Sequence, residues 1–144
     1  FSANYEIAPS VTMFAGYAYA SAKILDYTKI AANDTIDLSG KTMTDVPASI
    51  VTAGVSWKNR ILSLGLTFRY TGAMYINDQN TWDELLLSDQ YPAYSTVDLK
   101  LWRPVFRFCH LSLGIQNLFD VKIYDSKYYV GPGRFITAGL EVKF

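Results

Sequence analysis

The sequence has little of what would build a disulfide framework or a cysteine-rich zinc site, since its 144 residues include one cysteine, Cys109, and one histidine, His110. It also has no excess charge of either sign, because 13 basic side chains balance 13 acidic ones. A nucleic-acid-binding domain is expected to carry a basic face, so this balance argues against a nucleic-acid partner. No apolar run reaches the roughly 18 residues of a transmembrane helix.

Aromatic residues, by contrast, are abundant for a small soluble domain. The chain contains 11 tyrosines, 8 phenylalanines and 3 tryptophans, which together make 15% of its residues. It begins with Phe1 and shows no signal peptide, which leads us to expect a piece of a longer protein.

Segments of about ten residues alternate between apolar and small or polar side chains, and helical spacing fits none of them well. One apolar set is Leu62, Leu64, Leu66, Phe68 and Tyr70. A second, at the end of the chain, is Ile136, Ala138, Leu140, Val142 and Phe144. Successive residues of a strand point to opposite faces, so these segments are predicted to be strands with one apolar face.

The lengths of the predicted turns and loops separate a membrane barrel from a soluble sandwich. We expect strands near residues 1–6, 11–22, 48–57, 61–71, 94–102, 106–117 and 134–144. Tight turns are predicted at 9–10, 58–60 and 103–105, and long polar loops at 26–47, 72–92 and 120–133. Short turns at one end and long loops at the other are typical of outer-membrane barrels, where the short turns are periplasmic. Ten tilted residues also span the roughly 25 Å apolar band of such barrels.

The side chains on the second face of these strands agree with a barrel interior. Mid-strand glycines fall on this face, at Gly54, Gly65, Gly114 and Gly139. Glycine weakens a strand, and a curved wall around a crowded interior is one reason to retain it. The charged Asp98 and Lys100 share this inward parity, as required for charges at membrane depth. Cys109 has the outward parity and is interpreted as a small hydrophobic residue.

The C-terminal residues resemble the closing segment of TonB-dependent outer-membrane receptors. The similar stretches are Gly114–Asp120, then Tyr124 and Tyr129, then Gly131–Arg134, and finally Gly139–Phe144. Upstream, Gly40–Lys41 before Val46–Pro47, Arg69–Gly72, and Tyr94 with Asp98 also look similar. The resemblance covers roughly residues 12–144 and is most specific over about the last thirty.

This resemblance implies an all-β, antiparallel, up-and-down transmembrane barrel segment in the outer membrane of a Gram-negative cell. Residues 1–144 would supply about seven C-terminal strands of a barrel of about 22, without the plug domain or the energy-coupling box of the family. The implied function is import of a scarce nutrient, typically a ferric siderophore, haem, cobalamin or an oligosaccharide, driven by the TonB complex; of these, a ferric siderophore or similar iron chelate is the cargo we expect. The implied partners are outer-membrane lipid, lipopolysaccharide, the plug and remaining strands, and the nutrient. No catalysis, cofactor or metal site is expected.

The final strand also resembles the signal that the barrel-assembly machinery reads. The residues that match it are Thr137, Gly139, Val142 and Phe144. A last strand with a free edge can pair with another sheet by strand addition, which gives the signal a physical basis.

The candidate ligand-binding residues are aromatic side chains of the predicted long loops. They are Tyr27, Tyr75, Trp82, Tyr91, Tyr124 and Tyr128, with Tyr129 beside them. Planar rings suit aromatic chelates, and tyrosine hydroxyls bond chelate oxygens. The same tyrosines would equally form an interfacial belt. The acidic loop around Asp78, Asp83 and Glu84 lacks the spacing of a calcium loop.

Two other classes of protein remain open at this stage. His110 and Ser112 lie two residues apart on one strand face, as in outer-membrane phospholipases, but both have inward parity near the periplasmic end. A passive porin or an adhesin would show the same strand pattern, so periodicity does not exclude either.

Overall fold

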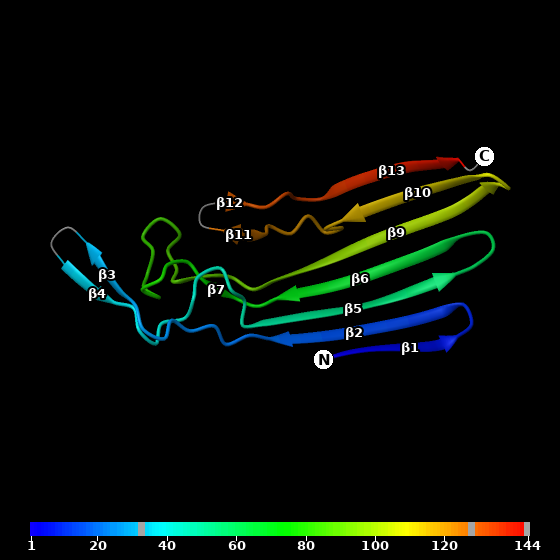
Figure 1. Ribbon diagram of the computed structural model, residues 1–144. Coiled ribbons are helices and arrows are strands. Elements are labelled where there is room, and N and C mark those ends of the chain that lie inside the picture. Colours follow the sequence, from blue (N-terminus) through cyan, green and yellow to red (C-terminus); the bar gives the residue numbers. More distant parts are fainter. Residues whose placement is uncertain (32–33, 127–128, 143–144) are drawn as a thin grey trace.

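The computed structural model describes residues 1–31, 34–126 and 129–142. Seven long strands form one antiparallel sheet in the order β1-β2-β5-β6-β9-β10-β13 (Figure 1). Each of them therefore pairs with the long strands that come before and after it in the chain. Their bounds are β1 Ser2–Ala8, β2 Val11–Tyr19, β5 Ser49–Lys58, β6 Ser63–Thr71, β9 Tyr94–Phe106, β10 Cys109–Gln116 and β13 Phe135–Val142. In the described part of the chain, no helix has the length and apolar character to cross a bilayer.

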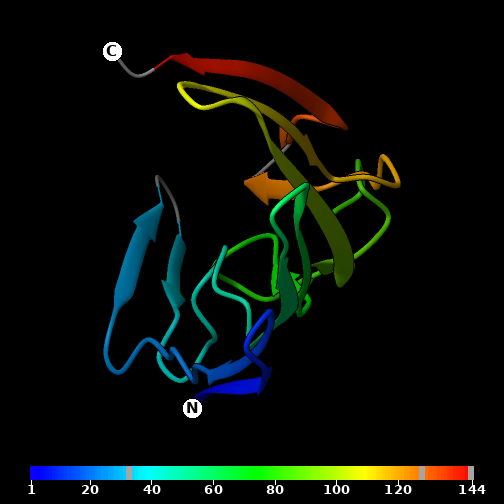
Figure 2. The same cartoon turned by 90° about the vertical axis from the view of Figure 1, so that its right-hand side faces the viewer.

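Three small hairpins decorate the connections between the long strands. They are β3 Thr28–Ala31 with β4 Asp34–Asp37, β7 Met74–Tyr75 with β8 Gln90–Tyr91, and β11 Tyr124–Ser126 with β12 Tyr129–Val130. The short turns lie at one end of the sheet and the long connections at the other (Figure 1). The sheet is an open curved wall, and the β3–β4 hairpin lies on its concave side (Figure 2). The predicted all-β meander is confirmed, as an unclosed portion of a barrel.

One predicted turn is wrong. The sequence places a turn at Arg103–Val105, whereas β9 continues to Phe106 and the turn is formed by Arg107 and Phe108. Pro104 lies inside the strand, opposite His110 of β10. On its other side β9 pairs with β6 only as far as Trp102. Proline lacks a ladder N–H, so it is tolerated here because the strand has lost one neighbour.

The register confirms the predicted division into two faces. On the outward face, Leu66 lies between Val55 and Leu99 in neighbouring strands. On the inward face, Thr67 lies between Gly54 and Asp98. Most apolar side chains therefore share one surface across the sheet, and most small, polar and charged side chains share the other; Phe14 and Trp102 on the inward face and Arg103 on the outward face are exceptions.

Close contacts explain two of the inward-facing glycines. A Cβ atom at Gly54 would lie 2.5 Å from the ring of Phe14, its cross-strand neighbour, and 2.7 Å from the Leu66 carbonyl oxygen. A Cβ atom at Gly139 would lie 2.7 Å from the hydroxyl of Ser112. Glycine at these positions leaves room for side chains that cross the concave face.

The buried hydrophobic core lies in the long connections and not against the sheet. The buried hydrophobic residues are Leu38, Met74, Ile76 and Tyr91. The outward face of the sheet stays open, with Leu66 and Phe68 exposed by 38% and 39% and Leu140 by 64%. An apolar surface of this extent marks an interaction site for protein or membrane. Among the described residues, no buried hydrophobic core packs against the outward-facing Leu64 and Leu66 of β6.

Candidate functional site

The connections 20–48, 72–93 and 117–134 gather at one end of the sheet, and we call them together the loop cap. Its first two parts are joined by Asn80, whose side chain accepts a hydrogen bond from the Thr42 N–H at 2.7 Å and donates to the Thr42 carbonyl at 2.9 Å. Asn80 holds a positive φ of 55°, which asparagine tolerates better than most residues. The Thr44 hydroxyl also donates to Asp78 at 3.3 Å.

A small core holds the second and third parts of the loop cap together. Met74, Ile76 and Tyr91 pack with the partly buried Leu86 and Tyr124. The rings of Tyr91 and Tyr124 stack with centroids 5.6 Å apart and an interplanar angle of 8°. The loop cap is consequently a packed structure with its own apolar centre.

Two of the cavities in the described residues are lined mainly by the first two parts of the loop cap. One of about 340 Å³ lies between its first two parts, and its lining combines an amine with carboxylates, hydroxyl and amide groups: Lys29, Thr44, Asp45, Asn77, Asp78 and Gln79, over Leu38 and Ile76. The other, of about 490 Å³, has an apolar and aromatic wall that includes Leu86, Tyr91 and Tyr124, with Ser88, Asp89 and Gln90 as its polar groups. Each offers hydrogen-bond partners beside apolar contact, as small-ligand sites do.

The Asn-Leu-Phe-Asp stretch after β10 has a structural role. The Asn117 side chain is 4% exposed; it donates to the Val121 carbonyl at 2.8 Å and accepts from the Val121 N–H at 2.9 Å. The Asn117 N–H donates to the inward-facing Asp98 carboxylate at 2.8 Å. Asp120 accepts from the Arg134 N–H at 2.7 Å and leaves no room for a side chain at Gly133. These residues tie the end of β10 to the start of β13.

The predicted ligand residues fall into different environments. Tyr27 and Trp82 are exposed by 55% and 63%, and Tyr75 is half-buried. Tyr91 is 2% exposed and packs in the core of the loop cap, where the half-buried Tyr124 stacks on it. Tyr129 is exposed by 72%. Tyr128 lies outside the described residues.

Sequence reasoning based on aromatic residues missed the polar lining of the smaller cavity. Lys29, Thr44 and Asn77 face it together, although they come from two separate connections. In the sequence these three residues lie in predicted long loops, as many other polar residues do, so nothing marked them as the lining of a cavity.

Several acidic groups of the loop cap accept local hydrogen bonds. Asp83 accepts from the N–H groups of Leu85 and Leu86 at 3.0 and 3.1 Å. Hydrogen bonds from the Ser39 hydroxyl and backbone lower the pKa of Asp37, because they favour its charged form. Within the described residues, no three histidine, cysteine, aspartate or glutamate side chains gather as a metal site would require.

The His110 and Ser112 side chains have separate neighbours. The His110 ring stacks on Trp102 with centroids 4.5 Å apart and an interplanar angle of 13°. The Ser112 hydroxyl donates to the Gly139 carbonyl at 3.4 Å. A nucleophile and its general base must lie within hydrogen-bond reach, so this arrangement does not support the phospholipase alternative.

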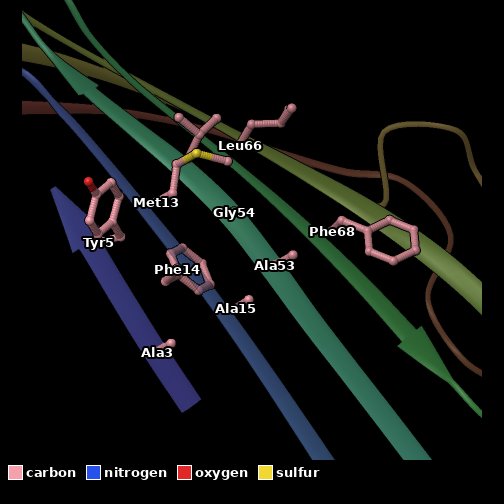
Figure 3. Close-up of a pocket in the computed structure, with 10 residues that line it drawn as sticks. Ala3, Tyr5, Met13, Phe14, Ala15, Ala53, Gly54, Leu66 and Phe68 are labelled. Atoms are coloured by element: carbon pink, nitrogen blue, oxygen red, sulfur yellow. The ribbon is translucent and has the colours of Figure 1, made fainter. Parts of the chain in front are cut away.

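A hollow of about 410 Å³ lies on the outward face, over strands β1, β2, β5 and β6 (Figure 3). Ala3, Ala15 and Ala53 stand in register on three neighbouring strands and form its floor. Larger side chains border it, namely Tyr5, Met13, Leu66 and Phe68 (Figure 3). Its lining is apolar, which suits hydrocarbon and not a polar chelate.

The predicted assembly signal lies on β13, an edge of the seven-stranded sheet. Thr137 and Gly139 pair with Gly114 and Ser112 of β10, and Val142 pairs with Cys109. Phe144 lies outside the described residues. Assembly signalling by these residues stays a prediction.

The class of protein is defined by a strand meander with an apolar outward face, a polar concave face and long loops at one end: this is a section of a membrane barrel wall. Residues 1–118 match the family model described as TonB dependent receptor-like, beta-barrel. The chain belongs to this family. The match ends at Leu118, so most of the C-terminal segment that carried the sequence resemblance lies beyond it.

Solved structures agree over nearly the whole chain. The chain is similar to the siderophore receptor PiuA from Acinetobacter baumannii, with 22% identity and a TM-score of 0.80 over 98% of this chain and 20% of that chain. It is also similar to the closed form of the ferric-catecholate import receptor Fiu from E. coli K12, with 22% identity and a TM-score of 0.74 over 99% and 20% of the two chains. The copper transporter OprC is similar as well, with 17% identity and a TM-score of 0.69 over 99% of this chain and 22% of that chain.

These comparisons define a fold and a portion of it. The chain spans about a fifth of the length of each of these structures. At such identities the likeness shows the fold alone. The family and these structures are receptors or transporters and not enzymes. No curated protein sequence matches the chain.

Proposed function

We propose that this chain is the C-terminal part of an outer-membrane receptor barrel that binds and imports a scarce nutrient with TonB-coupled energy. The cargo class is a ferric siderophore or a similar iron chelate. Support comes from the family and from the similar structures, which include a siderophore receptor and a ferric-catecholate import receptor.

One structural observation carries this proposal. The loop cap stands at the end of the sheet opposite the short turns, and it contains two cavities with polar and aromatic linings. In barrels of this type the long loops are extracellular, so cargo would meet the loop cap first. A chelate with aromatic rings and charged oxygens would use both kinds of lining.

The remainder of the machinery would come from the rest of the receptor. An open sheet leaves β1 and β13 with unpaired edges, which a bilayer does not accept, so further strands of the same barrel would complete the wall. The plug and the coupling to the TonB complex would likewise lie outside these 144 residues. Lipopolysaccharide and lipid would surround the outward face in a Gram-negative outer membrane.

The test uses the full-length receptor in cells and with purified protein. Deleting residues 74–90 should reduce binding and uptake of one member of a panel of ferric catecholate, hydroxamate and citrate complexes, while barrel assembly stays intact. The milder variant Tyr27→Ala/Trp82→Ala removes two exposed rings without disturbing the core of the loop cap. Unchanged affinity for every complex in both variants would contradict the proposed ligand site.

The energy dependence of uptake distinguishes the proposed active receptor from a passive porin or an adhesin. Uptake through an active receptor should stop when the TonB complex is deleted, whereas diffusion through a porin should continue. An adhesin should show no uptake in either strain.

A further inference from the structure

The neutral net charge of the chain conceals a division between its two ends. The three parts of the loop cap contain ten acidic and six basic side chains. The turn segments 58–62 and 103–108 contain four basic side chains and no acidic one: Lys58, Arg60, Arg103 and Arg107. Both turns lie at the end opposite the loop cap (Figure 1), where these four positive charges outnumber the two carboxylates of Glu6 in β1 and Glu141 in β13.

Arg103 has an unusual position on this wall. It follows Leu101 by two residues and pairs with Leu111, so it shares their outward face. Among the described residues of the seven strands, the register makes Arg103 the one charged residue on that face. The two strands that pair with β9, β6 and β10, contain no acidic residue, and Glu141 of the next strand, β13, pairs with His110 and has the inward parity. A charge beside an apolar band needs water or an ionic partner, and a long side chain reaches one at the interface.

The residues around Arg103 are exposed and aromatic. Phe106 and Phe108 are exposed by 64% and 56%, and their rings stack with centroids 6.2 Å apart. Arg107 is exposed in the turn between them. We call Arg103, Phe106, Arg107 and Phe108 the basic rim.

We propose that the basic rim binds the phosphate headgroup of an anionic phospholipid in the periplasmic leaflet. The guanidinium groups of Arg103 and Arg107 match a phosphate, for which arginine offers paired donors. The phenylalanine rings lie against the glycerol and upper acyl region, next to the row that contains Leu101 and Leu111. The occupant therefore needs a phosphate and a hydrocarbon chain in one molecule, which a phospholipid supplies and a peptide or a free phosphate does not.

The charge pattern selects the kind of lipid. The two arginines of the basic rim favour a headgroup of net negative charge, such as phosphatidylglycerol, because no acidic residue shares the outward face of the described strands. A zwitterionic headgroup carries its own ammonium group, which offsets the attraction. The site rests on the outer-membrane orientation of the proposed function but not on cargo transport, so a receptor that fails to import iron would still show it.

The experiment counts bound lipids on the purified full-length receptor by native mass spectrometry. The probes are phosphatidylglycerol and phosphatidylcholine with identical acyl chains, each titrated at low and high salt. Arg103→Gln/Arg107→Gln should weaken phosphatidylglycerol binding by about 30-fold. This fold-change corresponds to the loss of about 1 kcal/mol of binding free energy for each of the two arginines. Phosphatidylcholine binding should stay as in the unmodified receptor. High salt should reduce the difference between the two lipids.

Two further variants give the comparison its meaning. Lys23→Gln/Lys41→Gln removes two charges from the loop cap and should leave phosphatidylglycerol binding unchanged. Arg103→Lys/Arg107→Lys keeps the charge, and it should retain most of the binding even where the glutamine variant assembles poorly. Equal binding of the two lipids, or equal losses in the loop-cap and rim variants, would overturn the proposal. Binding of inorganic phosphate in competition with the lipid would show a phosphate site without a role for hydrocarbon, and would overturn it as well.

Discussion

Asn80 bonds the backbone of Thr42 on both sides, accepting from its N–H and donating to its carbonyl at 2.7 and 2.9 Å. The two residues lie 38 positions apart in the sequence, in different long connections. The side-chain amide reproduces the pairing that a neighbouring strand would give, and it joins the two loops together with the backbone hydrogen bond from the Asp45 N–H to the Tyr75 carbonyl at 3.3 Å.

We predict that Asn80→Ala separates the first two parts of the loop cap. The loss of partners for the part-buried Thr42 groups should cost about 1–3 kcal/mol locally. Hydrogen exchange measured by mass spectrometry on the full-length receptor should show faster exchange around residues 40–45 and 77–81, with the strands unchanged. Asn80→Gly keeps the positive φ without the hydrogen bonds and should behave similarly, while Gln79→Ala is the neighbouring control. Unaltered exchange in Asn80→Ala would contradict the role of this contact.

Gly54→Ala should destabilise the barrel through contact with Phe14. A Cβ atom 2.5 Å from the Phe14 ring forces a shift, with an expected cost of about 1–3 kcal/mol in the free energy of unfolding. Gly65→Ala is the matched control, because its nearest neighbour would be 3.9 Å away. Urea unfolding of the full-length receptor measures both.

The double variant Phe14→Ala/Gly54→Ala tests the cause. Removing the ring should recover part of the loss but not all, since the Leu66 carbonyl oxygen would still lie 2.7 Å from the new Cβ atom. An absence of any recovery would assign the cost to the backbone contact alone.

Tyr91 and Trp82 should differ in what their loss changes. Tyr91→Ala empties the core of the loop cap and should lower local stability by about 3–5 kcal/mol, whereas Tyr91→Phe keeps the packing. Trp82→Ala removes an exposed ring and should change stability by less than about 0.5 kcal/mol. Limited proteolysis of the loops measures stability, and binding of ferric complexes measures the site. If Trp82→Ala leaves binding intact, Trp82 is not part of the ligand site.

Deleting Phe144 is predicted to impair insertion of the full-length receptor, because the terminal aromatic residue belongs to the proposed assembly signal. The assembled fraction is measured from the heat-dependent mobility of the folded barrel on gels. Phe119→Ala removes another exposed aromatic residue, at the loop end, and should assemble normally. Normal insertion without Phe144 would count against the signal.

Alternation along the sequence was sufficient to predict the seven long strands and their two faces. A strand side chain points to one face or the other by parity alone. The faces of Leu66 and Thr67 could therefore be predicted without knowing which strands lie beside them. The turn at Arg103–Val105 was mispredicted because proline is a strong turn signal. The sequence did not indicate that β9 would continue beyond Trp102, where its pairing with β6 ends, and leave Pro104 paired only with β10.

The loop cap was decided by tertiary structure. Nothing in the sequence near Tyr91 separates a buried ring from an exposed one, and the distinction from Trp82 arises when Tyr124 arrives from another connection to stack on it. In the same way, the sequence supplied Arg103 as one charge among 26 in a predicted turn, and only the continuation of β9 to Phe106 placed it on the apolar face. Local periodicity is a property of the chain, and it fixes which way a strand residue points. Contacts between distant loops depend on how separate segments meet, so only the folded protein determines them.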